Sequence, residues 1–101
     1  MKTRLELQET LEELLGSRNV YYEPPANIKM EYPAIVYSRD NIQTRFAANK
    51  VYVGRPMYRL TVIDKKADNP VIAKLLNLEY CSYDRHYKSD NLNHDTFTIY
   101  L

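Results

Sequence analysis

Two acidic residues and a lysine could form the metal site of a nuclease. Asp40 and Asp64 each lie at a predicted strand end, and Asp64 stands two residues before Lys66. In metal-dependent nucleases, carboxylates hold Mg²⁺ and the lysine of an acid-x-Lys sequence orients the attacking water. This spacing is common in proteins, and the segment from Asp64 to Asp68 is also typical of a polar turn that caps a helix. We therefore prefer the turn and keep a metal-dependent nuclease as an alternative.

A second set of polar residues could bind a divalent metal across the predicted C-terminal hairpin, because imidazole and carboxylate groups are common metal ligands. Their spacing matches none of the established metal motifs, and such residues at a turn are more often solvent-facing or turn-forming groups. We therefore predict neither a metal site nor another cofactor. The set comprises Asp84, His86, Asp90, His94 and Asp95.

Cys81 and His86 could be a thiol nucleophile and its base. They are an odd number of residues apart on one predicted strand, so regular alternation places their side chains on opposite faces. We predict that Cys81 is a small buried apolar residue. As the single cysteine of the chain it cannot form an internal disulfide, and nothing implies an oxidising compartment.

The middle of the chain is basic. Residues 39–66 carry seven basic and two acidic side chains, although the net charge of the chain is only +1. Phe46, Tyr52 and Tyr58 are interleaved with these charges, so the segment could stack on and neutralise a nucleic acid. A solvated face and a surface for an acidic protein partner are the alternatives. A small nucleic-acid-binding module therefore stays open beside the nuclease.

Glycine is scarce, and this excludes several enzyme classes. The chain has only Gly16 and Gly54. A phosphate-binding loop, a dinucleotide fingerprint and a G-x-S-x-G elbow each need glycines close together. We predict no catalytic residues and expect that the protein is not an enzyme.

Length and composition predict one ordinary globular domain, residues 1–101. The chain is 45% hydrophobic and 27% charged, which argues against disorder. No apolar run reaches the 18 or more residues of a membrane span, and the N-terminal residues lead into an amphipathic pattern, not a signal peptide. We expect a soluble protein of a reducing cytoplasm.

The elements that must position these residues follow from the hydrophobic pattern. Leucines at helical spacing and a capping box predict a helix from Thr3 to Leu15 that ends at Gly16. An apolar stripe after Asp68-Asn69-Pro70 predicts a second, short helix. β-branched and aromatic runs predict strands at Asn19–Glu23, Pro33–Arg39, Arg55–Asp64, Tyr80–Tyr87 and Asp95–Leu101.

This order of elements is typical of an α+β fold, with a mainly antiparallel sheet of four to five strands and two helices packed on one face. Two connections are long in this prediction. Residues 88–93 form a polar turn, and Asp40 to Gly54 form a loop far longer than the usual hairpin connection of about 2–5 residues. Loops of that length usually carry a function or are disordered.

Four stretches resemble a family of small neck proteins from long-tailed phages and prophages of Gram-positive bacteria. Members are called minor capsid, tail-completion, tail-terminator or head-tail joining proteins. The resemblance spans nearly the whole chain and is carried by residues 19–25 (NVYYEPP), 32–37 (YPAIVY), 59–64 (RLTVID) and 90–95 (DNLNHD).

The resemblance implies a structural virion protein assembled in the bacterial host cytoplasm. It implies a homohexameric ring at the head-proximal end of the tail tube, with the major tail protein and the head connector or stopper protein as partners. We predict that the segment Asp40 to Gly54 makes contacts between subunits or with DNA in the channel. The predicted interface residues are Arg45, Phe46, Lys50 and Arg55, with Phe46 as the apolar contact and the basic residues facing acidic groups or phosphate.

Overall fold

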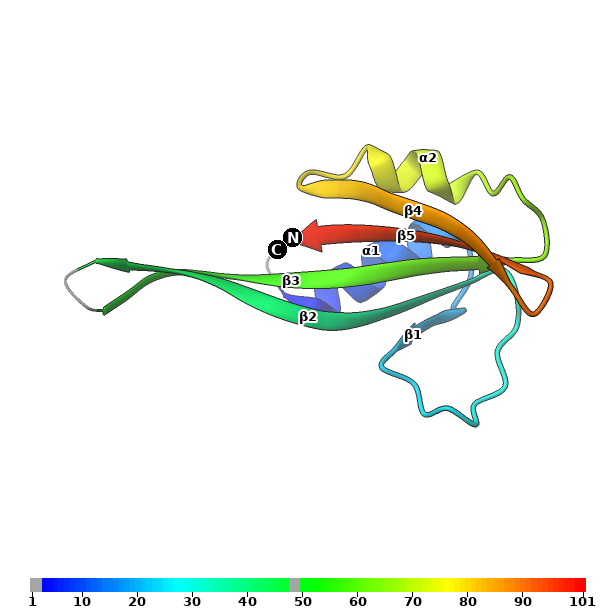
Figure 1. Ribbon diagram of the computed structural model, residues 1–101, viewed down its shortest axis with the longest axis horizontal. Coiled ribbons are helices and arrows are strands. Elements are labelled where there is room, and N and C mark those ends of the chain that lie inside the picture. The colour runs from blue at the N-terminus through cyan, green and yellow to red at the C-terminus, as the bar shows by residue number, and fades with distance from the viewer. Residues whose placement is uncertain (1–2, 48–49) are drawn as a thin grey trace.

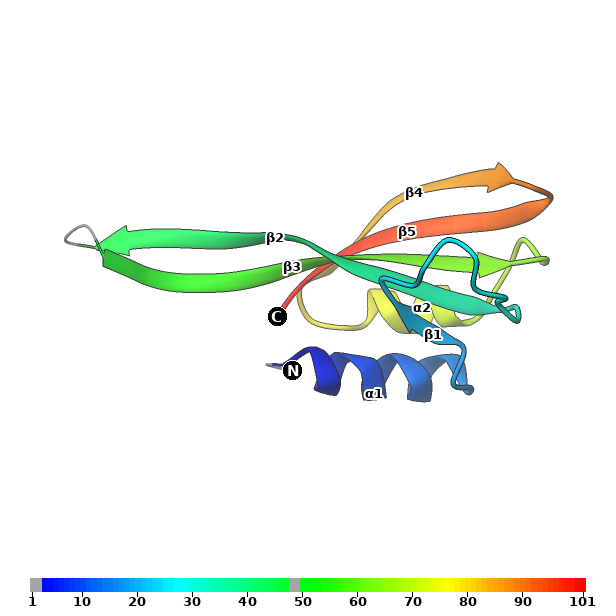
Figure 2. The same cartoon turned by 90° about the horizontal axis from the view of Figure 1, so that it is seen from below.

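The computed structural model describes residues 3–47 and 50–101. It contains two helices and one five-stranded sheet, in which β1 is parallel to β2 and the other neighbours are antiparallel (Figure 1). Both helices lie on the same side of the sheet (Figure 2). The predicted α+β fold is therefore confirmed, including the order of its elements. The elements are α1 (Arg4–Leu15), β1 (Val20–Tyr22), β2 (Ala34–Ala47), β3 (Lys50–Asp64), α2 (Val71–Leu76), β4 (Cys81–Ser89) and β5 (Leu92–Tyr100).

Helix α1 begins and ends where its local sequence indicates. The Thr3 hydroxyl accepts a hydrogen bond from the backbone N–H of Glu6 at 3.1 Å, which satisfies one of the free donors of the first turn. Gly16 follows the helix with φ 80°, a left-handed conformation that costs glycine little. Between these ends, Leu7 and Leu11 are one turn apart and both are buried.

Helix α2 is held at its start by Asn69. The Asn69 side-chain oxygen accepts the N–H of Val71 at 2.9 Å, and its amide donates to the Asp64 carboxylate at 2.7 Å. Val71 and Leu75 are the buried residues of this helix. The turn after β3 and the start of α2 are thus one hydrogen-bonded unit.

The core lies between the two helices and the sheet face that they cover. Leu7, Leu11 and Leu75 from the helices pack in one cluster with Leu60 of β3 and Phe97 of β5. Leu60 lies directly opposite Phe97 in the sheet, so the two side chains share a face. Each such side chain contributes about 1.5–3 kcal/mol by its burial.

Our prediction of a long loop from Asp40 to Gly54 is wrong. Strand β2 runs on to Ala47 and β3 begins at Lys50, so the described part of this segment is a continuous antiparallel hairpin. The predicted boundary failed because Asp40-Asn41 and Gly54 are turn-type residues in most contexts. Here they lie within a ribbon whose register shifts at two points, Arg39/Asn41 and Arg45/Phe46, as β-bulges allow.

The connection between β4 and β5 is also shorter than predicted. The strands extend to Ser89 and from Leu92, and leave only Asp90 and Asn91 between them. These two residues have φ values of 53° and 62°, the left-handed pair of a two-residue hairpin turn. Aspartate and asparagine tolerate that conformation better than most residues.

Candidate functional site

The hairpin of β2 and β3 projects beyond the rest of the molecule (Figure 1). The pairing of β1 with β2 ends at Tyr37, and that of β5 with β3 ends at Met57. Farther out, among the residues that the structure describes, the two strands pair only with each other. We call residues 42–47 of β2 and 50–56 of β3 the arm.

The dimensions of the molecule reflect the arm. Its principal extents are 51 × 30 × 24 Å and its radius of gyration is 14.6 Å, whereas a compact domain of this size has a radius of about 13 Å. Six residues of paired strand span about 20 Å. The arm therefore accounts for the elongation.

A two-stranded ribbon of this kind is marginally stable in water by itself. It exposes two strand edges with free N–H and C=O groups, a structure that other chains pair with readily. The side chain of Ile42, at the inner end of the arm, is 44% exposed. A partner that covers the ribbon would pair its free strand edges and bury its exposed apolar side chain.

The four predicted interface residues all lie on the arm, but in two places. The backbone of Arg45 is opposite Val53, Phe46 is opposite Val51, and Lys50 is opposite Ala47 at the outer end. Arg55 lies near the inner end, opposite Gln43.

Arg55 contacts the body of its own chain. Its guanidinium stacks on the ring of Tyr80 at 4.2 Å, and its Nε donates to the backbone oxygen of Leu101 at 3.4 Å. The N–H of Leu101 in turn donates to the oxygen of Pro56 at 3.0 Å. Arg55 thus fixes the base of the arm, a role that the sequence did not indicate.

The candidate nuclease residues are not brought together. Asp40 forms an ion pair with Arg59 at 3.4 Å, near the position where β3 leaves β5. Asp64 lies about 20 Å farther along the sheet, where its carboxylate accepts the N–H of Lys66 at 3.2 Å. The geometry around Asp64 is that of the polar turn.

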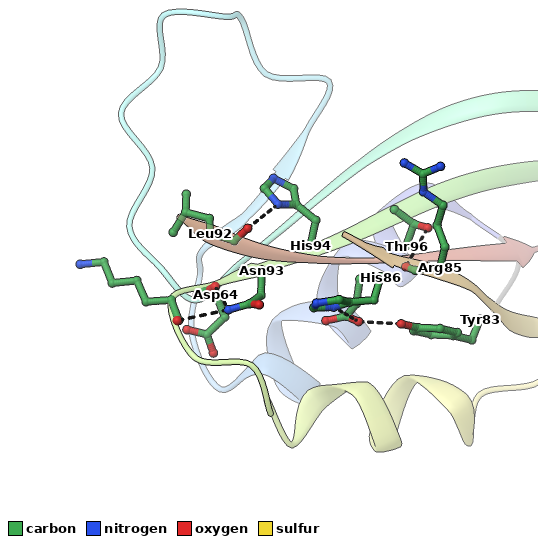
Figure 3. Close-up of polar contacts among 10 residues, drawn as sticks. Asp64, Tyr83, Arg85, His86, Leu92, Asn93, His94 and Thr96 are labelled. Atoms are coloured by element: carbon green, nitrogen blue, oxygen red, sulfur yellow. Dashed lines mark hydrogen bonds and ion pairs between the residues drawn. The ribbon is translucent and has the colours of Figure 1, made fainter. Parts of the chain in front are cut away.

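Tyr83 and His86 of β4 point toward α2 (Figure 3), and both contact Asp95 of β5 in a cluster on the helix-covered face of the sheet. The hydroxyl of Tyr83 donates to Asp95 Oδ1 at 2.7 Å, and Nδ1 of His86 lies 2.9 Å from the same oxygen. The side chain of Asp95 is 8% exposed and that of His86 is 44% exposed. The hydrogen bond to Asp95 raises the pKa of Tyr83, because the carboxylate favours the protonated phenol.

A β-bulge makes this convergence possible. Tyr83 is opposite Phe97 but Arg85 is opposite Thr96, so Asp84 is an extra residue in β4. Beyond the bulge the alternation of side chains reverses. Tyr83 and His86 therefore share a face despite their odd spacing.

The same bulge contradicts our placement of Cys81 and His86 on opposite faces. Cys81 lies opposite Ile99 and His86 opposite Asp95, which belong to one face of β5. The two positions are nevertheless about 14 Å apart along the strand. Cys81 is partly buried against the core, and this burial raises the pKa of its thiol to about 11.

The other members of the candidate metal set lie elsewhere. The ring of His94 stacks on Tyr87 with centroids 4.7 Å apart, on the opposite sheet face from Asp95. The Asp84 carboxylate accepts a hydrogen bond from Thr98 at 2.8 Å. Among the described residues, no group of three or more histidine, cysteine or acidic side chains is placed to hold a metal ion.

Beside the Tyr83 cluster lies a groove between α2 and β4, with a volume of about 470 Å³. Its apolar wall is formed by Ile72, Leu76 and Tyr83. Leu76 is 47% exposed and Tyr83 is 41% exposed. We call this the α2–β4 groove; its polar side is formed by Asp68, His86 and Asp95.

Within the described ranges 3–47 and 50–101, neither helix has the length and apolar character needed to cross a membrane. The chain shows no significant match to a known protein family, to a curated protein or to a solved structure.

Proposed function

We propose that this protein is a structural virion protein of the phage neck. It forms a homohexameric ring that terminates the tail tube and joins it to the head connector. The observation that carries the proposal is the arm, a ribbon that leaves the body with both edges and at least one apolar side chain uncovered. The proposal assigns the chain no catalytic residue, metal or cofactor.

The arm is suited to a ring because it projects far enough from the body to contact a neighbouring copy. A projecting element that binds a different surface of a neighbour gives a head-to-tail interface, and such interfaces close into rings when the rotation permits. The ordering of the ribbon costs about 1–2 kcal/mol per residue, and contact with a neighbour offsets this cost.

The charge of the arm is consistent with its proposed partners. Residues 42–56 carry three basic side chains, Arg45, Lys50 and Arg55, and no acidic one. Arg55 is already engaged with Tyr80, so the proposal assigns the contact with a neighbouring subunit or with DNA in the channel to Arg45 and Lys50. The remaining partners are the major tail protein and the head connector or stopper, in a virion assembled in the host cytoplasm.

The test is a substitution at the outer part of the arm. Phe46→Asp replaces an apolar residue of the arm by a charge, and we expect the variant to fold but to lose self-association. Ile28→Asp is the matched control, because Ile28 is 38% exposed and belongs to the connection between β1 and β2. Circular dichroism measures folding, light scattering measures assembly, and electron microscopy measures tail length in a phage that carries each variant.

Two results would contradict the proposal. If the Phe46→Asp protein folds and still assembles with tails of normal length, the arm is not the contact between subunits. If the variant unfolds, Phe46 belongs to the core of its own chain, and the arm is not an independent projection.

A further inference from the structure

The surface that receives the arm has to satisfy two requirements. It has to bury apolar side chains, because the arm sequence contains Ile42, Phe46 and Val51. It also has to accept hydrogen bonds from cations, because the charged residues of the arm are all basic and carry donors only.

The arm cannot reach the α2–β4 groove of its own chain. The groove is built around Asp95, which lies opposite Val62 on β3. The arm begins at the other end of that pairing, near Met57, about 17 Å along the strand, and it extends in the opposite direction (Figure 1). Only another copy can place its arm in the groove.

The α2–β4 groove meets the apolar requirement. Leu76 and Tyr83 are two of the large apolar side chains that the molecule exposes, and both line the groove together with the partly buried Ile72. Its volume of about 470 Å³ has room for a few side chains from the end of a ribbon.

The polar side of the groove meets the second requirement. The Asp95 carboxylate, held by Tyr83 at 2.7 Å and by His86 at 2.9 Å, gives this side of the groove a negatively charged acceptor. Asp68 adds an exposed carboxylate at the rim. Acceptors in a half-apolar groove complement the cations of the arm.

A groove along α1 is one competing surface, and it meets one requirement only. It is lined by Glu9, Glu12, Glu13, Ser17 and Arg18. Its three glutamates can pair with the arm's cations, but no large apolar side chain among the described residues lines this groove to cover Phe46. The α2–β4 groove offers both.

We infer that the arm of one copy binds in the α2–β4 groove of the next copy, with Phe46 against Leu76 and Tyr83 and a basic side chain directed to the exposed carboxylate of Asp68. This inference rests on the proposed ring and adds the surface that receives the arm. It makes the interface head-to-tail, with each copy contributing an arm and a groove.

Disulfide trapping tests the contact in the full-length protein, including an association that is weak in dilute solution. In a Cys81→Ala background, the double variant Phe46→Cys with Leu76→Cys should form a ladder of cross-linked oligomers under mild oxidation. The matched variant Phe46→Cys with Glu9→Cys presents another exposed position, in the α1 groove, and should give about tenfold less cross-linked product, as expected when a central apolar contact is replaced. Circular dichroism establishes that both variants are folded.

The outcomes separate this inference from the proposed function. A ladder that depends on Leu76→Cys supports both. A ladder with Glu9→Cys and none with Leu76→Cys overturns the groove assignment, although the arm still joins the copies. If neither pair cross-links and Phe46→Asp leaves assembly unchanged, the proposed function fails together with the inference.

Discussion

Asp95 is the residue on which the Tyr83 cluster depends. Its carboxylate is almost fully buried and accepts hydrogen bonds from Tyr83 and His86 through one oxygen. A buried carboxylate is stable only if its hydrogen bonds are made. Tyr83 and His86 therefore fix the position of the Asp95 carboxylate. The carboxylate in turn holds both side chains at the edge of the groove.

We predict that Asp95→Asn lowers the free energy of unfolding by about 1–3 kcal/mol, because charge-assisted hydrogen bonds to a buried group are lost. Asp90→Asn is the control. Asp90 is exposed in a turn with φ 53°, which asparagine adopts equally well, so its effect should stay within about 0.5 kcal/mol. Urea unfolding curves followed by circular dichroism measure both. Equal effects of the two substitutions would contradict the role given to Asp95.

Cys81 should react slowly in the folded protein. Burial raises its thiol pKa to about 11 from an ordinary value of 9.0, so at pH 8 the reactive thiolate is about a hundredfold scarcer than for an unperturbed thiol. The rate of alkylation by iodoacetamide should rise about tenfold per pH unit between pH 8 and 10. It should increase sharply when urea unfolds the chain. Native and unfolded rates that agree would mean that Cys81 is not buried.

At the scale of elements, the two helices could be predicted and the arm could not. Helix α1 is specified by neighbouring residues, since Thr3 and Gly16 mark its ends and Leu7 and Leu11 its buried face. A ribbon outside the core has no such buried face to impose an alternating pattern. Its strand pairing crosses Asp40-Asn41 and Gly54, and residues of these types usually interrupt a strand.

The Tyr83 cluster could not be predicted from the sequence, because its geometry also depends on strand pairing. Both His86 and Asp95 were identified as candidates, but regular alternation in β4 gave no reason to join Tyr83 to them. The bulge at Asp84 changes which side chains share a face. No residue type in that stretch marks a bulge, so only the pairing with β5 reveals it.

The end of α1 gives a prediction about backbone conformation alone. A Cβ added at Gly16 meets nothing within 4 Å, but φ there is +80°. Gly16→Ala should therefore lower the free energy of unfolding by about 1 kcal/mol through backbone strain. Gly16→Asn should cost less, because asparagine tolerates this conformation. Thermal unfolding of the three proteins checks the order, and an alanine variant as stable as the parent would contradict it.

At the scale of the molecule, the arm and the body should be separable. Among the residues whose burial the structure describes, those that form the core lie at positions 7–37 and 58–99. Replacement of residues 44–54 by Asn-Gly, a two-residue hairpin turn, should therefore leave the unfolding midpoint nearly unchanged. The radius of gyration should fall from 14.6 Å to about 12 Å.

Small-angle X-ray scattering and thermal unfolding measure the two quantities on the same sample. The parent chain, measured at the same dilution, is the control. A shortened chain that loses its cooperative unfolding would mean that the body needs the arm.

The separation of arm and body has an evolutionary consequence. We expect substitutions in the core to be restricted by folding, and substitutions along most of the arm to be restricted mainly by whatever the arm touches. The length and sequence of residues 42–54 can therefore drift or be exchanged between lineages while the sheet and helices persist. The binding specificity of the arm can then diverge faster than the fold of the body.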